Sequence, residues 1–432
     1  MSNFAEVAGK WEQGAEDVID TLVAPTGETP SAGVSPDEFT EGFGEDIHRA
    51  LDVDTWQTGE DLGAVYTRIE AEVQAAVEQE QQHRTVIREH LFPQLGEYGG
   101  APPHAGVYAA EQGVVERIHR GILFNGGIEA CDATLQSHDS VPLTIFQIGV
   151  SLVSYQGNQG TWGQRLYRRD LRVSSGDPIE EMMQLLERRE QRGGLNQAGG
   201  RDTLARLARR GIMAYAERAI LLRRSQATWR MGHGTPAPFE LLTGSGSLDL
   251  MIESIKVIRE LVEGHQKFVF VASEPSDRLL LTIGDALRPM EFAIVRSLRD
   301  VIAPTVEHAH FRSQPYTSDT RWDGIRLSPH EWILRFRDEV APQVVVGVYR
   351  ATRLAPPHVF YAHADHADLA AHIAIADSVL QEHRGFPLLI DLADTVCRGA
   401  FGRDTLDGPV SSAYADAGTP FRYVSERRTR YK

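Results

Sequence analysis

Three strand-like segments follow one another between residues 127 and 173, and they limit the chain to folds that contain an antiparallel meander. The first segment is 127–134, the second is the apolar run 145–155, and the third is the more polar run 163–173. The turn-forming sequence Gly-Asn-Gln-Gly at 157–160 separates the second segment from the third. Strands joined by such short connections pair antiparallel.

The segments after the meander predict a parallel strand pair. The apolar run 239–243 predicts a strand, the Gly-Ser repeat at 244–247 a turn, 248–264 a helix, and 267–273 another strand. This order favours a mixed sheet covered by helices, which is an α/β fold. The other predicted elements are helices at 62–92, 109–121, 177–190, 202–224 and 388–396, and strands at 331–336 and 344–352. The long segment 299–329 shows little periodicity and is expected to be a loop.

Charge is unevenly distributed along the chain. Residues 1–61 contain 15 acidic residues and only two basic ones, so they carry −13 of the formal net charge of −16. We expect a partly disordered acidic arm at 1–61, a helical segment at 62–120 and a folded core at 121–432. The arm either keeps the chain in solution or docks against a basic partner or a nucleic-acid cleft. The apolar stripe of the long helix at 62–92 fits packing within the chain and dimerisation equally well.

Several protein classes lose support from the sequence. No G-x-x-x-x-G-K-[ST] phosphate loop and no G-x-S-x-G motif is present, and 244–247 lacks the lysine that holds a triphosphate. No apolar stretch approaches the length of a membrane span, and the first residues lack the pattern of a secretory signal. We therefore expect no membrane contact and a cytoplasmic location. In a reducing compartment, Cys131 and Cys397 are expected to be buried free thiols.

The order of four short motifs resembles the NurA nuclease family, whose core is similar to the RNase H and Piwi folds. Asp132-Ala133-Thr134 takes the place of an Asp-Gly-Ser sequence at the end of the first strand, and Glu217 that of a helical glutamate. The run 241–247 takes the place of a second strand that ends in Asp-Gly-Ser. The run 385–394 is similar to a final motif that begins Gly-Tyr-Pro and ends Ala-His, with Asp394 in the histidine position.

This resemblance spans about residues 120 to 432, and it implies a fold, an activity and a site. The fold is a mixed RNase H-like sheet flanked by helices, preceded here by the long helix and the acidic arm. The implied catalytic residues are Asp132, Glu217 and Asp394. Thr243 stands where the second motif has its acid, so either Glu240 or Asp249 joins Asp132 and Glu217 as a metal ligand, or one ligand is missing and activity is impaired.

The implied cofactor is Mn²⁺ or Mg²⁺, because phosphodiester cleavage needs an activated water and compensation of charge on phosphorus. Two divalent ions about 3.5 to 4 Å apart supply both, and hard ions of this kind prefer carboxylate oxygens. Each acid also has a purely structural interpretation. Asp132 could cap a strand, Glu217 could pair with Arg218 or Arg224, and Asp394 could pair with Arg398.

The resemblance further implies DNA as substrate, a homodimer, and a HerA-type hexameric translocase that feeds DNA into it for end processing or anti-phage defence. The alternative is a catalytically decayed subunit that binds the ATPase or DNA as an adaptor. Arginine suits phosphate contacts, and the candidate nucleic-acid-binding residues are Arg168, Arg172, Arg209, Arg427 and Arg428. A third hypothesis is a separate metal site in the histidine-rich segment 358–372, which holds His363, His366 and His372, although capping of a helix explains that segment equally well.

Overall fold

The computed structural model describes residues 35–56, 62–140, 143–169, 176–192, 203–273, 277–307 and 321–419. The chain divides into two compact units, one that ends at Ala76 and one that contains nearly all of the chain from Val77 onward. The first unit holds α2 (Pro36–Phe43), α3 (Ile47–Leu51) and most of α4 (Leu62–Val86). Among the described residues, no helix combines the length and apolar character needed to cross a bilayer.

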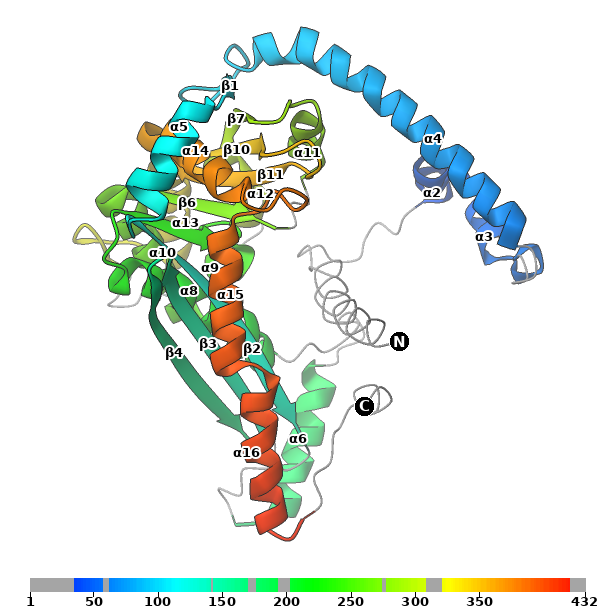
Figure 1. Ribbon diagram of the computed structural model, residues 1–432. Helices are drawn as coiled ribbons and strands as arrows, with labels where there is room; N and C mark the ends of the chain where they lie inside the picture. The colour runs from blue at the N-terminus through cyan, green and yellow to red at the C-terminus, as the bar shows by residue number, and fades with distance from the viewer. Residues whose placement is uncertain are drawn as a thin grey trace. The chain divides into compact units, whose positions relative to one another are not determined.

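A nine-stranded mixed sheet forms the centre of the second unit (Figure 1). In spatial order its strands are β1 (Gly106–Ala109), β7 (Glu291–Ser297), β10 (Val344–Arg350), β11 (His358–His363), β6 (Phe268–Ala272), β5 (Trp229–His233), β2 (Ile128–Asp139), β3 (Thr144–Ser154) and β4 (Gly157–Arg168). Strands β2, β3 and β4 pair antiparallel, β5 runs parallel to β2, and β6 runs parallel to β5. The order β4-β3-β2-β5-β6 with these directions is the RNase H-like arrangement, so the predicted fold class is confirmed.

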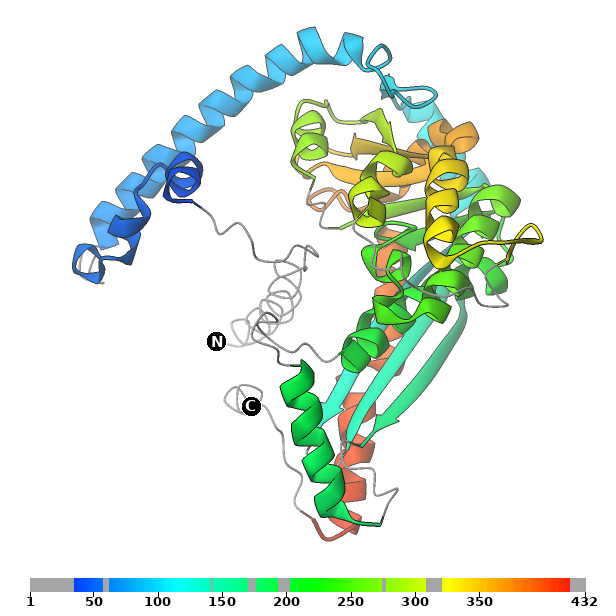
Figure 2. The same ribbon diagram turned by 180° about the vertical axis from the view of Figure 1, so that it is seen from behind.

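Helices cover both faces of the sheet, as Figure 1 and, from behind, Figure 2 show. One apolar core lies under α8 (Met213–Arg224), α10 (Leu248–Arg259), α11 (Arg278–Asp285), α12 (Leu298–Glu307) and α13 (Pro329–Arg335). The other core lies under α5 (Gln112–Ile118), α14 (Ala367–Ser378) and α15 (Leu388–Phe401). The other α-helices and strands of this unit are α6 (Pro178–Arg192), α7 (Thr203–Arg206), α9 (Phe239–Leu242), α16 (Arg403–Asp416), β8 (Arg321–Trp322) and β9 (Ile325–Arg326).

The predicted meander is present, but two of its strands have different bounds from those predicted. Strand β2 continues to Asp139, so Asp132 lies in the middle of the strand and not at its end. Strand β4 begins at Gly157, so the turn consists of Tyr155 and Gln156 and comes earlier than the glycine-rich sequence predicted. The reason is that Asn158 and Gln159, although typical of turns, sit on an edge strand where polar side chains meet solvent.

Three predicted assignments were wrong. The run 239–243 is the short helix α9 and not a strand, since Pro238 begins it and a short apolar run fits either state. The run 331–336 is helical: residues 331–335 lie in α13, whose capping box joins Ser328 and Glu331, and Phe336 begins the helical turn that follows. The segment 299–329 is not one loop: it contains most of α12 and the strands β8 and β9, while 308–320 lie outside the described residues.

The strand that sequence reasoning missed is β5, which occupies the place expected for 239–243. Its sequence, Trp-Arg-Met-Gly-His, has too few apolar residues to suggest a buried strand. Arg230 is nevertheless only 9% exposed, because its guanidinium donates to the carbonyl oxygens of Leu221, Leu222 and Ser225 at the C-terminal end of α8. A charged residue is tolerated in the strand because the unpaired carbonyls of a helix end satisfy it.

Candidate active site

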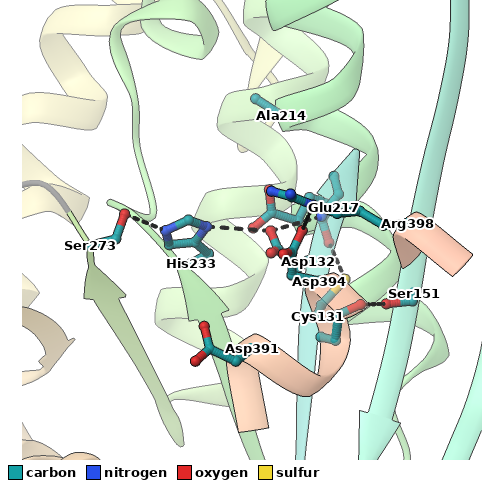
Figure 3. A network of polar contacts seen from close by, with 12 residues as sticks. Cys131, Asp132, Ser151, Ala214, Glu217, His233, Ser273, Asp391, Asp394 and Arg398 are labelled. Atoms are coloured by element: carbon teal, nitrogen blue, oxygen red, sulfur yellow. Dashed lines mark hydrogen bonds and ion pairs between the residues drawn. The ribbon is translucent and has the colours of Figure 1, made fainter. Parts of the chain in front are cut away.

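Three carboxylates that are far apart in the sequence lie together on the sheet (Figure 3). Asp132 comes from β2, Glu217 from α8 and Asp394 from α15. Asp132 and Glu217 are each only 6% exposed, and the Asp394 side chain is 29% exposed. Burial of several carboxylates side by side is costly unless cations or specific hydrogen bonds compensate for it. The arrangement is therefore a strong candidate for a functional site.

Helix α15 is held in place at its start by a buried acid. The carboxylate of Asp377, which is fully buried, accepts a hydrogen bond from the backbone N–H of Leu389 at 2.9 Å and another from the hydroxyl of Tyr155. Burial raises the pKa of Asp377 to about 6, although these two hydrogen bonds favour its charged form. Asp377 thus satisfies an N–H in the first turn of the helix that carries Asp394.

Side chains of β3 fix the rest of α15. Ser151 Oγ donates to the carbonyl oxygen of Ala393 at 2.6 Å, and Gln147 Nε2 donates to that of Phe401 at 3.0 Å. The Phe401 ring lies directly over Gly149 of β3 and Gly163 of β4, where an added Cβ would come within 2.3 Å of it. These contacts determine how far along the sheet Asp394 lies, and so bring it next to Asp132.

Glu217 is held by its neighbour in the chain. Arg218 Nη1 donates to Glu217 Oε2 at 2.8 Å, and Arg218 Nη2 donates to the carbonyl oxygens of His233 at 3.1 Å and Thr235 at 2.7 Å. The Arg218 guanidinium also stacks over the Phe270 ring, 5.7 Å from its centroid. Arg218 therefore ties α8 to the end of β5 and leaves Glu217 Oε1 buried with no hydrogen-bond partner among the described residues.

The charges of the three acids influence one another. Burial raises the pKa of Glu217 to about 7, with a further contribution from the Asp132 charge, while Arg218 and His233 act in the opposite direction. Burial and then the charge of Asp132 also raise the pKa of Asp394, against the effect of its ion pair with Arg398 at 2.7 Å. A site that disfavours its own negative charges in this way gains free energy by binding a cation.

His233, at the end of β5, is the site residue that sequence reasoning missed. Its Nδ1 lies 3.4 Å from Asp132 Oδ1, and its Nε2 lies 2.8 Å from Ser273 Oγ (Figure 3). Burial acts against the charged imidazole, but the hydrogen bond to Asp132 and the charges of Asp132 and Glu217 outweigh it and raise the pKa to about 9. The signal in the sequence was Gly232-His233-Gly234-Thr235, a small-residue motif at the end of the first strand that follows the Glu217 helix.

The structure places the other candidate ligands elsewhere. Glu240 lies on α9 with its Oε1 3.6 Å from Arg210 Nη1, and Asp249 is exposed in the first turn of α10. Within the described ranges, neither hydrogen bonds or pairs with Asp132, Glu217 or Asp394. Thr243 donates its hydroxyl to the Phe239 carbonyl in a helical turn. The strand that follows the Glu217 helix ends in His233, whereas Thr243 directly follows the short helix α9 and lies in no strand.

The donor set has the right chemistry for a hard divalent ion. Carboxylate oxygens are the ligands that Mg²⁺ and Mn²⁺ prefer, and the unpartnered, buried Glu217 Oε1 is free to accept a cation. Across the part of the chain that the structure describes, no three His, Cys, Asp or Glu side chains already surround a single point in metal-binding geometry. Arg218 and Arg398 each hold one oxygen of a candidate ligand, Glu217 and Asp394 respectively.

The candidate nucleic-acid contacts are not all described. Arg172, Arg427 and Arg428 lie outside the described residues. Arg209 stacks over the Phe146 ring, 5.5 Å from its centroid, and Arg168 pairs with Thr144 on β3. Side chains alternate along a strand, so Phe146 and Arg168 share the sheet face opposite to Asp132. Cys131 and Cys397, both buried, are free thiols, as predicted.

The fold and the site together define an RNase H-like α/β protein with a buried cluster of acids. The NurA nuclease from Sulfolobus solfataricus is similar in fold, with 10% identity, coverage of 81% of this chain and 98% of that chain, and a TM-score of 0.41. A NurA structure with manganese is 9% identical, covers 80% of this chain and 98% of that chain, and has a TM-score of 0.37. An Endonuclease V from Ciona intestinalis in complex with inosine-containing DNA is 11% identical, covers 63% of this chain and 84% of that chain, and has a TM-score of 0.24. No protein-family model and no curated protein matches the sequence.

Proposed function

We propose that this chain is a metal-dependent nuclease that cleaves DNA with Mn²⁺ or Mg²⁺ bound by Asp132, Glu217 and Asp394. The observation that carries the proposal is the convergence of these three acids, from β2, α8 and α15, on one site with an unpartnered buried oxygen. When bound, divalent ions would supply an activated water and compensate for charge on the phosphate. Arg398, whose side chain is 58% exposed beside Asp394, is suited to contact a backbone phosphate.

The test is cleavage of linear and supercoiled DNA by the full chain. We expect cleavage in Mn²⁺, none in EDTA, and a loss on the order of 10³-fold in Asp132→Asn, since the amide cannot supply the charge that holds the ion. Asp249→Asn serves as the matched control, because Asp249 is an exposed aspartate on α10. Cleavage that survives in Asp132→Asn at the wild-type rate rules out this site.

We also propose partners, as the resemblance implies: a second copy of the chain and a HerA-type hexameric translocase, in DNA end processing or anti-phage defence. An apolar stripe on α4 supports a protein partner. Tyr66, Ile69, Val73 and Val77 recur at three- and four-residue steps and are 50 to 62% exposed. Such a stripe usually packs against another helix. Light scattering of the wild type and of Ile69→Glu/Val73→Glu, with and without the ATPase, tests whether α4 provides the contact.

The rival function is an adaptor that binds DNA or the ATPase without cutting. The ion pairs of Glu217 with Arg218 and of Asp394 with Arg398 favour it, because each holds a carboxylate oxygen that a metal would need. The cleavage assay with the ATPase present separates the two functions. An adaptor retains DNA or ATPase binding but shows no metal-dependent cleavage under any of these conditions.

A further inference from the structure

Asp377, near the end of α14, is a buried acid that the proposed function does not use. Its carboxylate is fully buried, and among the described residues no basic side chain forms an ion pair with it. It accepts hydrogen bonds from the Tyr155 hydroxyl and from the backbone N–H of Leu389, the latter at 2.9 Å. A carboxylate that is buried without a cation is costly unless hydrogen-bond donors hold it. Asp377 thus joins α14 to the turn after β3 and to the start of α15.

The start of α15 depends on this acid because it has no cap of its own. Pro387 occupies the N-cap position and offers no side-chain acceptor. The first N–H groups of a helix have no partner within the helix, and Leu389 is fully buried, so water does not satisfy its N–H. The negative charge of Asp377 also lies at the positive end of the helix. Asp377 therefore does for α15 what a capping side chain does for other helices.

The same helix carries Asp394, five residues after Leu389. At 1.5 Å per residue, the two lie about 7.5 Å apart along the helix axis, which is less than two turns. Ser151, the cross-strand partner of Asp132, and the Phe401 ring attach α15 to the sheet from Ala393 onward. Asp377 attaches the helix before Asp394. Asp394 therefore lies between two attachments, and release of the first would let the beginning of α15 shift.

We propose that Asp377 is a positioning residue of the site: it holds the Leu389 N–H and so sets the place of Asp394 relative to Asp132. This inference rests on the proposed function, in which both acids bind the metal. The competing interpretation is that Asp377 stabilises the fold and has no particular effect on Asp394. The two differ in one measurable respect, because a positioning residue affects metal binding only while the residue that it positions is present.

The test is a double-mutant cycle on the Mn²⁺ affinity of the full chain, measured by titration calorimetry. We expect Asp377→Ala to weaken Mn²⁺ binding about tenfold. In the Asp394→Asn background, the same substitution should change the affinity by less than about twofold, since the ligand that it positions is already lost. Asp377→Asn should recover most of the affinity, because its amide oxygen still accepts the Leu389 N–H.

Hydrogen exchange of the metal-free chain, followed by mass spectrometry, gives a second readout. Exchange of the backbone amides at the start of α15 should be faster in Asp377→Ala than in the wild type, and nearly unchanged in Asp377→Asn. If Asp377→Ala does not fold, Tyr155→Phe takes its place in the cycle, with a smaller expected loss because it removes one of the two donors.

The matched control is Asp277→Ala. Asp277 caps α11 through the Leu280 N–H at 3.2 Å, and α11 carries no acid of the site, so Mn²⁺ affinity should stay within about twofold. Equal losses for Asp377→Ala in both backgrounds, no loss in either, or unchanged hydrogen exchange overturns the inference while the proposed function stands. If the wild type binds no Mn²⁺, the proposed function fails and the inference fails with it.

Discussion

The carboxylate site and the histidine-rich segment 358–372 contain the same residue types, but the chain uses them in opposite ways. In the segment, burial lowers the pKa of His358 and of His363 and so favours their neutral forms. His358 Nε2 lies 2.8 Å from the carbonyl oxygen of Arg384, and the ring packs on Tyr349 and Phe386. In the carboxylate site, the pKa of His233 is raised to about 9 because of Asp132.

The difference shows that many potential metal ligands close together in the sequence do not by themselves form a metal site. The segment holds six histidines and aspartates within fifteen positions, yet strand β11 and helix α14 bury His358, His363 and His372, and Asp365 and Asp368 are exposed. The carboxylate site draws its three acids and His233 from four elements, and Arg218 and Arg398 each pair with one of the acids. A functional site is recognised by unbalanced charge in a buried place, and not by composition.

The largest expected effect is on DNA cleavage, where Glu217→Ala and His363→Ala should differ strongly. We expect Glu217→Ala to lower metal-dependent DNA cleavage on the order of 10³-fold, since the unpartnered oxygen is lost. His363→Ala should leave cleavage within about twofold, because His363 lies in the core and contacts no acid of the site. The measurement is the initial rate on linear DNA at saturating Mn²⁺. Comparable losses in both variants would show that the segment also takes part.

Removal of Arg218 should give the next largest effect, on stability. Arg218→Met leaves Glu217 buried without its ion-pair partner, and breaking such a pair costs about 3 to 5 kcal/mol of unfolding free energy. Adding Glu217→Gln in the same chain should recover much of that loss, because the uncompensated charge is gone. Urea unfolding of the metal-free protein measures both.

The matched control for Arg218 is Lys256→Met, which breaks the exposed pair with Glu253 and should cost less than about 1 kcal/mol. If the double variant Arg218→Met/Glu217→Gln is no more stable than Arg218→Met alone, the guanidinium acts through its contacts with the His233 and Thr235 carbonyls. In that case its pairing with Glu217 is of little importance to the fold.

More of the fold than of the candidate site could be predicted from the sequence, and strand β5 shows why. The meander and the long helices followed from apolar periodicity, and the acids Asp132, Glu217 and Asp394 were implied only by the resemblance in motif order. Strand β5 did not, because Arg230 interrupts its apolar pattern and is satisfied only by the end of α8, a contact between separate elements. Because strand β5 was missed, the second motif was compared with the run 241–247 and His233 was not considered.

The interaction of Glu217 with its surroundings should appear as a pH dependence of stability. Its pKa is raised from 4.5 to about 7 in the folded chain, mainly by burial, so the folded state binds a proton more tightly than the unfolded state. Stability from this group is fully present below pH 4.5 and is lost as the pH rises to 7. The shift corresponds to about 3 kcal/mol. Urea unfolding of the metal-free chain between pH 4.5 and 7.5 should show the decline, and Glu217→Gln should flatten it.

The smallest expected effect has the opposite sign and belongs to His363. Burial lowers its pKa below 6.5, so the unfolded state binds a proton that the folded state rejects. Stability from this residue is present above pH 6.5 and is lost as the pH falls below that value. His363→Asn should therefore reduce the loss of stability between pH 6.5 and 5.5, by less than the Glu217 effect. An increase of that loss in His363→Asn would mean that the histidine is charged in the folded chain, and the contrast between the two regions would then disappear.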